Sequence, residues 1–300
     1  MSSQIQALQK EIEKSFLGHP SVVEKALVCF LAKGHLLIED EPGVGKTLLA
    51  QSLSRALGLE FRRIQMTPDL LPSDLTGGLL WNPNPGEFRF RPGPMFANVV
   101  LLDELNRASA KTQSAALQAM EERKITVDGV DHVLPPMFFV IATQNPFESA
   151  GVNALPESQL DRFALKLKVG RLSREAEKQI LMSGEREERL ARVEVRLRPA
   201  ELMHAQEQVK KITVSDAVLN YLLKIAEKLR SEKQASLSTR ALQSLLHLAQ
   251  AQAFLKGRDF VLPEDARDLA VEAWAHRARV LGSREATLHV EDVIRDTAAF

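Results

Sequence analysis

The sequence predicts an α/β protein, in which a mostly parallel β-sheet lies between helices and is followed by an all-helical C-terminal part. Short apolar runs of strand length alternate with helical patterns up to about residue 170, and the strand signal then disappears. Strands that alternate with helices favour a parallel sheet covered on both faces. The five predicted strands are residues 36–38, 61–66, 98–103, 137–143 and 163–169.

The spacing of apolar residues predicts the helices. Residues 46–57 and 111–123 have helical spacing between predicted strands, and the polar, amphipathic N-terminus predicts a further helix. The C-terminal helices are expected at residues 173–181, 198–212, 215–229, 238–257 and 263–279. We therefore expect an α/β domain over residues 1–196 and a helical domain over residues 197–300, with the linker inside the charged stretch 184–199.

Composition restricts the class of protein. The chain has 300 residues, enough for two domains, and its 45% hydrophobic and 26% charged residues are ordinary for a water-soluble globular protein. Lys plus Arg equals Asp plus Glu at 39 each, so no overall charge favours nucleic acid or an anionic membrane. Cys29 lies in an apolar run and is expected in the core. Because it is the single cysteine, the chain can form no internal disulfide, which suits a reducing compartment.

The sequence gives no signal for secretion, for a membrane or for a metal cage. No apolar stretch reaches transmembrane length, and the polar N-terminus differs from a signal peptide, so we expect a cytoplasmic protein. The seven histidines show no ligand spacing with Cys, Asp or Glu. We therefore assign no chemistry to them.

The most informative stretch joins the first predicted strand to the helix that follows it. Pro42, Gly43 and Gly45 turn the chain there. A loop of this kind points consecutive backbone N–H groups at one place, at the positive end of a helix dipole, and that place suits a phosphate. Lys46 would then contact the β- and γ-phosphates, and the hydroxyl of Thr47 would bind Mg²⁺.

One position departs from the full phosphate-loop pattern, which has a glycine five residues before Gly45. This chain has Asp40 there. The loop could therefore be a plain turn at a helix start. The lysine and threonine that follow Gly45, together with the flanking strand and helix, favour phosphate binding.

Two carboxylates stand at the carboxyl end of the buried run 99–103. Asp103 could hold Mg²⁺ through water, and Glu104 could act as a general base toward the attacking water. The simpler alternative is that this Asp-Glu pair only marks a strand end. The phosphate loop earlier in the chain favours the catalytic interpretation.

Three more residues could act on the γ-phosphate. Asn145 follows another apolar run and could bind the phosphate or orient water, although Asn-Pro also favours a plain turn. Arg162 precedes the last predicted strand and Arg240 starts a helix of the second domain. Either arginine could stabilise charge developing on the γ-phosphate. By spacing alone, each is more simply a surface residue or an ion-pair partner.

Residues 67–96 are unusual because they are rich in proline and glycine and contain Trp81, which we expect to be exposed. A simple α/β unit would need only a helix here. The stretch could be padding, but long loops carry function often enough that we favour a functional insertion.

Taken together, these motifs closely resemble the MoxR family of AAA+ ATPases. The stretches that carry the resemblance are DEPGVGKT at 40–47, TPDLLPSDLTGG at 67–78, FRFRPGPMFAN at 88–98, LLDELNRASAKTQSAALQAMEER at 101–123, VIATQNP at 140–146, LPESQLDRF at 155–163 and STRA at 238–241. The resemblance covers nearly the whole chain and is strongest over residues 34–170. Asp40 resembles a form common in this family.

The resemblance implies an AAA+ P-loop NTPase core with a parallel five-stranded sheet and a C-terminal helical lid that closes on the nucleotide. It implies that the nucleotide contacts are Leu17, Gly18, Glu41, Pro42, Gly43, Val44, Gly45, Lys46, Thr47 and Leu48, with Thr47 and Asp103 as the Mg²⁺ residues. The catalytic set that it implies is Glu104, Asn145 as sensor 1, Arg162 as the arginine finger and Arg240 as the sensor 2 arginine on the lid.

The resemblance also implies cofactors and partners. These are ATP and Mg²⁺, a homo-oligomeric ring that is usually hexameric, and an Arg162 that acts on the ATP of a neighbour. Residues 67–96 resemble the helix-2 insert and residues 125–136 a β-hairpin, elements that face the pore or a client in related proteins. MoxR proteins resemble chaperones that mature protein complexes, some by metal or cofactor insertion, often with a partner carrying a von Willebrand factor A domain.

Other functions stay open on the sequence alone. The same ATPase could act on nucleic acid, because minichromosome maintenance helicases share the helix-2 insert. The balanced charge of the chain argues against this. The chain also resembles the ATPase subunit of magnesium chelatase. A nucleotide-binding scaffold without activity is disfavoured by the two acidic residues at 103–104.

Overall fold

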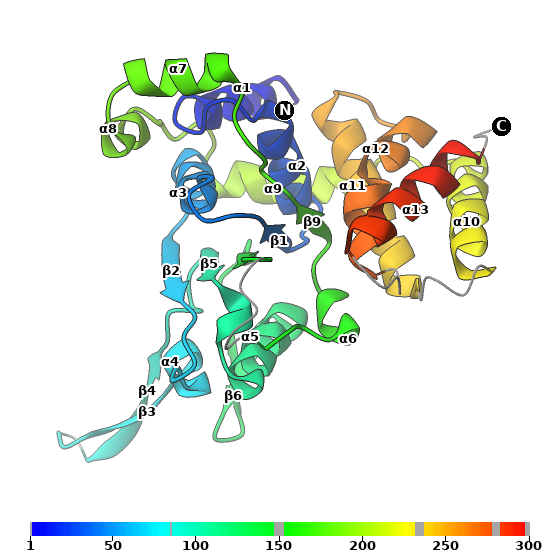
Figure 1. The fold of residues 1–300 in the computed structure, drawn as a ribbon. Helices are drawn as coiled ribbons and strands as arrows, with labels where there is room; N and C mark the ends of the chain where they lie inside the picture. Colours follow the sequence, from blue (N-terminus) through cyan, green and yellow to red (C-terminus); the bar gives the residue numbers. More distant parts are fainter. Residues whose placement is uncertain (1, 85, 147–152, 232–236, 278–282, 298–300) are drawn as a thin grey trace.

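The computed structural model describes residues 2–84, 86–146, 153–231, 237–277 and 283–297 (Figure 1). Its centre is a five-stranded sheet in the order β2-β5-β8-β1-β9, in which all neighbouring strands run parallel. The strands are β1 (Leu36–Glu39), β2 (Phe61–Gln65), β5 (Val99–Asp103), β8 (Phe139–Gln144) and β9 (Leu165–Leu167). The predicted α/β class and the five predicted strands are confirmed.

Alternate residues of the central strands face two different cores. Leu36 and Ile38 of β1 belong to one core, and Leu37 between them belongs to the other. Both sets are apolar because the sheet is covered on both faces, which explains the unbroken apolar runs in the sequence. The first core contains α1 (Ser2–Glu13), α2 (Pro20–Leu31) and α3 (Lys46–Ala56), and the second contains α5 (Ala110–Glu122). Cys29 is fully buried in the first core, as predicted.

The insertion at residues 67–96 forms a short helix, α4 (Pro72–Thr76), and an antiparallel hairpin of β3 (Gly77–Asn82) and β4 (Glu87–Pro92). The hairpin extends away from the sheet in Figure 1. A second hairpin, β6 (Lys124–Val127) with β7 (Val130–Val133), occupies the position expected for one. The two hairpins touch, because the rings of Phe90 and His132 stack with centroids 3.7 Å apart.

The C-terminal helices form a bundle that shares a core with α1–α3. They are α9 (Pro199–Val209), α10 (Asp216–Ser231), α11 (Thr239–Leu255), α12 (Pro263–Trp274), the 3₁₀ turn η2 (Ala275–Arg277) and α13 (Ser283–Arg295). Helix α11 packs against α2, and α12 packs against β9. In Figure 1 the bundle α10–α13 lies on the opposite side of α2 from α3.

The charged stretch 184–199, where we expected the linker, is folded against the core. It follows α7 (Arg174–Met182) and contains α8 (Arg186–Ala191), a helix that the sequence analysis did not predict. Arg55 on α3 donates to the carbonyl of Val193 at 2.9 Å, and Arg196 forms a 2.6 Å ion pair with the buried Glu11 of α1. The charges of this stretch therefore bind helices of the core.

Buried polar contacts of η2 attach the helical bundle to the segment before β9. The guanidinium of Arg277 donates to the carbonyls of Ala273 and Phe163, both at 2.9 Å, and its Nε lies 2.9 Å from Oδ1 of Asp161. Nε2 of His276 lies 3.1 Å from the carbonyl oxygen of Phe163. Burial lowers the pKa of Arg277 to about 10, so the residue stays charged at neutral pH.

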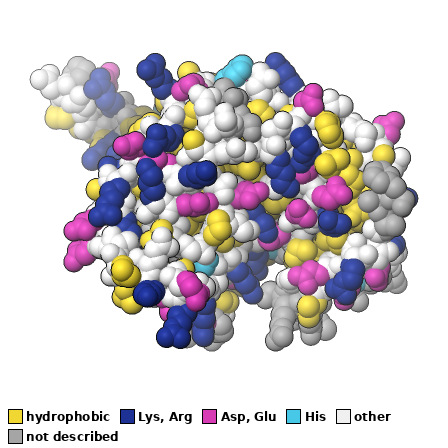
Figure 2. Space-filling view, turned by 90° about the horizontal axis from the view of Figure 1, so that it is seen from above, with side chains coloured by type: hydrophobic (Ala, Val, Ile, Leu, Met, Phe, Trp, Pro, Cys, Tyr) yellow, Lys and Arg dark blue, Asp and Glu magenta, His cyan; other side chains and the backbone are white. Residues whose placement is uncertain are grey.

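Charged side chains of both signs are mixed on the surface. On the face shown in Figure 2, lysines and arginines alternate with acidic side chains. The formal net charge of the chain is zero. In the part of the chain that the structure describes, no helix is both long and apolar enough to cross a membrane.

The Arg277 contacts predict a stability effect. Arg277→Ala should lower the free energy of unfolding by about 3–5 kcal/mol, because it removes one partner of a buried ion pair. Arg267→Ala on α12 is the matched control: its side chain is half exposed and pairs with Asp268 at 3.9 Å, so the loss should be below about 1 kcal/mol. Urea denaturation measures both, and equal losses would show that Arg277 does not anchor the bundle.

Candidate functional site

The loop after β1 has the backbone that a phosphate site requires. Gly43 and Gly45 have φ angles of 88° and 91°, in the left-handed region that glycine adopts without strain. Gly45 is the N-cap of α3, so the helix begins at Lys46. The first N–H groups of a helix have no partner within it, and they face the loop.

The side chain of Lys46 lies over this loop. Its Nζ donates to the carbonyl oxygens of Asp40 and Glu41, the latter at 3.2 Å. The ammonium group therefore lies against the start of the loop. This is the placement expected for a lysine that contacts a bound phosphate.

Asp40, which departs from the general loop pattern, has a structural role here. One oxygen of its carboxylate accepts from the N–H of Glu41 at 2.8 Å, and the other accepts from the N–H of Gly170 at 2.7 Å. These bonds attach the start of the loop to the segment after β9. A glycine could not form this connection.

The structure places the segment 16–19 beside the loop. The ring of Phe16 contacts the position where a Cβ of Gly45 would lie. A Cβ on Gly18 would lie 2.5 Å from Leu172 and 2.7 Å from Ala176 of α7, so only glycine fits there. Burial lowers the pKa of His19, and the charge of Asp40 partly opposes this. Leu17 and Gly18 are thus next to the loop, where the resemblance expects the adenine contacts.

Asp103 and Glu104 lie at the same edge of the sheet as the loop. Asp103 is 8% exposed; its Oδ1 accepts from the hydroxyl of Thr143 at 2.6 Å, and its Oδ2 pairs with Arg63 at 2.6 Å. Glu104 has a φ of 59°, which is uncommon for a residue other than glycine, and its N–H donates to Oγ1 of Thr143 at 2.8 Å. Thr143 on β8 therefore connects both acidic residues.

The carboxylate of Glu104 is also oriented by its neighbours. Gln65, the last residue of β2, donates to Oε2 at 2.8 Å, and Arg107 of η1 (Leu105–Arg107) donates to the same oxygen at 3.2 Å. The sequence analysis missed Arg63, Gln65, Arg107 and Thr143. The position of Thr143, two residues before Asn145 at the end of an apolar run, was the one usable signal.

Asn145 is close to the loop as well. It directly follows β8 and is buried, with 7% exposed. The carbonyl of Gln144, next to it, accepts from the N–H of Asp40 at 3.2 Å. Since β5, β8 and β1 are adjacent and parallel, the residues that follow them meet at one edge of the sheet. The structure thus brings together Lys46, Asp103, Glu104 and Asn145.

The donors present fit a magnesium ion that is bound together with a nucleotide. Mg²⁺ prefers oxygen ligands and is usually held by one or two protein groups plus phosphate and water. Thr47 in the first turn of α3 and the oriented carboxylate of Asp103 supply such groups. Within the described ranges, no group of three or more His, Cys, Asp or Glu could form a separate metal cage.

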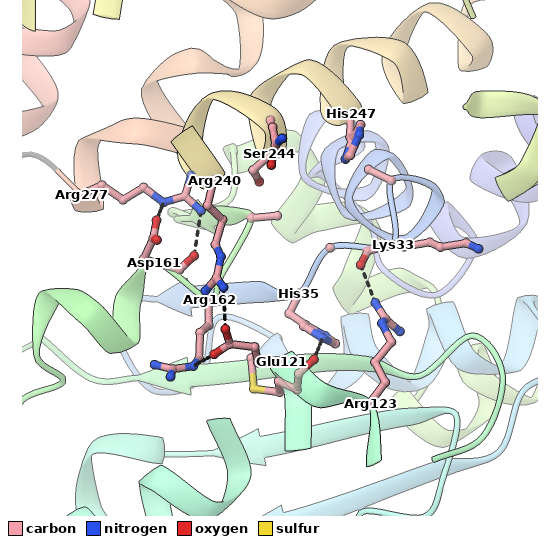
Figure 3. A pocket seen from close by; sticks show the side chains of 15 residues that line it. Lys33, His35, Glu121, Arg123, Asp161, Arg162, Arg240, Ser244, His247 and Arg277 are labelled. Atoms are coloured by element: carbon pink, nitrogen blue, oxygen red, sulfur yellow. Dashed lines mark hydrogen bonds and ion pairs between the residues drawn. The ribbon is translucent and has the colours of Figure 1, made fainter. Parts of the chain in front are cut away.

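Arg162 and Arg240 lie elsewhere, side by side on one carboxylate (Figure 3). Nε of Arg162 donates to Oε2 of Glu121 at 2.8 Å, and a terminal nitrogen of Arg240 donates to Oε1 at 2.5 Å. Arg162 follows α6 (Glu157–Leu160), whereas Arg240 is in the first turn of α11, whose N-cap is Ser238. Ser238 also donates to the carboxylate of Asp161 at 3.2 Å, so the two arginines are tied together by their neighbours too.

The pocket around these arginines is at the opposite edge of the sheet from the loop. Gly34 and His35, which precede β1, line it, whereas the loop follows the other end of β1. A four-residue strand separates its ends by about 13 Å. The structure therefore does not bring Arg162 or Arg240 to Lys46 of the same chain. In the lid, helix α11 packs on α2 and α12 packs on β9.

His35 lines this pocket and connects two of the elements around it. Its Nδ1 accepts from the N–H of Val140 at 3.0 Å, and its Nε2 lies 3.2 Å from the carbonyl oxygen of Met120. Burial, with a smaller contribution from Arg123, lowers the pKa of His35 to about 3, so the ring is neutral. The ring joins β8 to the end of α5, next to Glu121.

Comparisons with known proteins identify the family of the chain. Residues 35–165 match the ATPase family associated with various cellular activities (AAA), and residues 228–297 match the AAA lid domain. Over 292 residues the chain is 35% identical to the chaperone MoxR1 of Mycobacterium tuberculosis, which covers 92% of this chain and 77% of the relative. The chain belongs to the MoxR family of AAA+ ATPases.

Two further proteins are similar over most of their length. YeaC of Bacillus subtilis, which is described as uncharacterized, is 42% identical over 270 residues, covering 89% of this chain and 84% of YeaC. A crystal structure from Cytophaga hutchinsonii, provisionally described as an ATPase, matches with a TM-score of 0.87 and 32% identity, over 99% of this chain and 94% of the other. The AAA+ core and the helical lid of this MoxR-family chain are thus confirmed.

The bridge through Thr143 predicts an effect on ATP hydrolysis. Thr143→Val keeps the shape of the side chain but removes the hydroxyl between Asp103 and Glu104. We expect kcat to fall about tenfold to a hundredfold, because small misplacements of reacting groups cost that much, while the Kd for ATP changes little. Thr126→Val, in the hairpin β6–β7, is the control and should leave kcat unchanged. An unchanged kcat in Thr143→Val would remove Thr143 from the site.

Proposed function

We propose that this MoxR-family protein hydrolyses ATP at sites shared by neighbouring copies in a ring, and uses the energy to remodel a protein client. The placement of Arg162 and Arg240 carries this proposal. They are at the opposite edge of the sheet from the phosphate loop of their own chain. A phosphate that meets them must therefore be brought by a second copy of the chain.

One half of the shared site consists of the residues at the carboxyl edge of the sheet. The loop N–H groups and Lys46 bind the β- and γ-phosphates. Thr47 and Asp103 would hold Mg²⁺, which would neutralise charge on the triphosphate. Glu104 accepts the proton of the attacking water, with its carboxylate oriented by Gln65 and Arg107.

The other half comes from the neighbouring copy. Arg162 and Arg240 present two guanidinium groups, which bind phosphate oxygens with fixed geometry and stabilise charge in the transition state. Each copy then offers its loop on one side and its arginines on the other. Such a head-to-tail contact closes into a ring when the rotation between copies divides a full turn, and the family resemblance favours six copies.

The exposed hairpin β3–β4 supports a protein as the client. Leu80, Trp81 and Phe88 each expose more than half of their surface there, and exposed apolar groups of this kind mark protein contact sites. A related protein bears the name chaperone. We extend the proposal to maturation of a protein complex, including insertion of a metal or cofactor, and to a partner with a von Willebrand factor A domain.

The surface charge disfavours the alternative of a motor on nucleic acid. The net charge is zero, and the face in Figure 2 has no single-sign region. Binding to nucleic acid depends on basic surfaces that contact phosphates. A role like that of the magnesium chelatase subunit would use the same ATPase site and would differ only in the client.

Replacing Arg162 separates ATP binding from hydrolysis. In Arg162→Ala we expect the Kd for ATP to change little, because the loop and Lys46 hold the bound triphosphate and Arg162 acts mainly on charge that develops in the transition state, while kcat falls by about 10³ or more. The control is Arg62→Ala, which removes an exposed arginine of β2 that pairs with its near neighbour Glu60. Steady-state hydrolysis and binding of a fluorescent ATP analogue measure the two quantities. Full hydrolysis by Arg162→Ala would exclude the shared site.

A further inference from the structure

Glu121 is the feature that joins the two arginines, and neither motif nor spacing pointed to it. It lies near the end of α5, in the pocket at the opposite edge of the sheet from the loop. Its two carboxylate oxygens each accept from a different arginine, one from the core and one from the lid. Figure 3 shows both guanidinium groups converging on this carboxylate from different elements.

The carboxylate leaves most of each guanidinium available. An arginine has five N–H donors. Arg162 uses one on Glu121 and one on the carbonyl of Ser158, and Arg240 uses one on Glu121. Their side chains are 26% and 53% exposed. Glu121 therefore orients both groups without covering them.

Two carboxylates lie among the cations of this pocket. Glu121 pairs with Arg162 and Arg240, and Asp161 pairs with Arg277. Arg162, Arg240 and the buried Arg277 are gathered in one pocket and repel one another. The pKa of Glu121 lies below its ordinary value, first because Arg240 donates to it, so it is ionised at neutral pH. Its neutral amide counterpart, glutamine, would occupy the same space without offsetting this repulsion.

The base of Glu121 is held firmly. The ring of His35 lies 3.2 Å from the carbonyl oxygen of Met120, and Arg123 donates to the carbonyl of Lys33 at 2.6 Å and to that of Phe138 at 3.0 Å. The residues on both sides of Glu121 are thus bonded to the segments that lead into β1 and β8. The carboxylate thereby connects an arginine of the core to an arginine of the lid.

We propose that Glu121 is a positioning residue for the shared site: its carboxylate holds Arg162 and Arg240 side by side so that both reach the ATP of a neighbouring copy together. This inference rests on the proposed function. The phosphate of the neighbour binds the outward donors, and Glu121 keeps its own two bonds. Binding of one phosphate by two arginines depends on the orientation of each guanidinium.

The test uses Glu121→Gln, with Glu122→Gln as the matched control. Glu122 is the next residue on α5, is exposed, and accepts from Gln118 at 2.8 Å. We expect kcat of Glu121→Gln to fall about tenfold to a hundredfold, because both arginines lose their orientation, while the Kd for ATP is unchanged. Glu122→Gln should retain the normal rate.

Mixing variants shows on which copy Glu121 acts. Glu121→Gln has an intact loop, and Lys46→Ala has a dead loop but an intact Glu121. In an equal random mixture, roughly a quarter of the interfaces of a ring pair an intact loop with an intact Glu121. The mixture should therefore regain about a quarter of the normal rate per subunit. A loss that came only from damage to the fold of Glu121→Gln would not be restored.

Other results overturn the proposal in distinguishable ways. A normal rate in Glu121→Gln, with Arg162→Ala inactive, would reject the role of Glu121 and leave the shared site intact. A low rate that Lys46→Ala does not restore, although the same partner restores Arg162→Ala, would also reject it. If neither mixture regains activity, the shared site itself is wrong and the role of Glu121 is rejected with it.

Discussion

The common direction of the five strands is the constraint on which every placement in this protein depends. Because β1, β5 and β8 are parallel neighbours, the loop, the two acidic residues and Asn145 meet at one edge of the sheet. For the same reason, residues that precede strands gather at the opposite edge, where Arg162 lies before β9. The loop and the arginines are thus separated within one chain, which is the basis of the proposed contact between copies.

The attachment of the lid strengthens this separation. Arg277 and His276 bind the segment 161–163, and Ser238 binds Asp161, so the lid is fixed next to Arg162. Movement of the lid would therefore move Arg240 and disturb its bond to Glu121, the carboxylate that also binds Arg162. In the proposed ring, this coupling links the position of the lid of one copy to hydrolysis in its neighbour. The carboxylate of Glu121 makes this connection, because it binds Arg240 of the lid and Arg162 of the core.

Local patterns named the candidate residues of both halves of the site, including Arg162 and Arg240, but not the residues that connect them. The loop, Asp103, Glu104 and Asn145 were found because each stands directly after an apolar run with its chemistry in adjacent residues. Gln65 and Thr143 belong to other strands, and only the strand order places them beside Glu104. Glu121 is 41 residues from Arg162 and 119 from Arg240, so no local pattern could connect them. The prolines and glycines of the insertion likewise obscured the hairpin β3–β4.

The rate of ATP hydrolysis per subunit, measured against protein concentration together with the oligomeric state, tests the shared site most directly. We predict that the rate per subunit rises with concentration in step with assembly, because a single chain holds its arginines at the wrong edge for its own ATP. A rate per subunit that stays constant while the protein passes from single chains to rings would contradict the account.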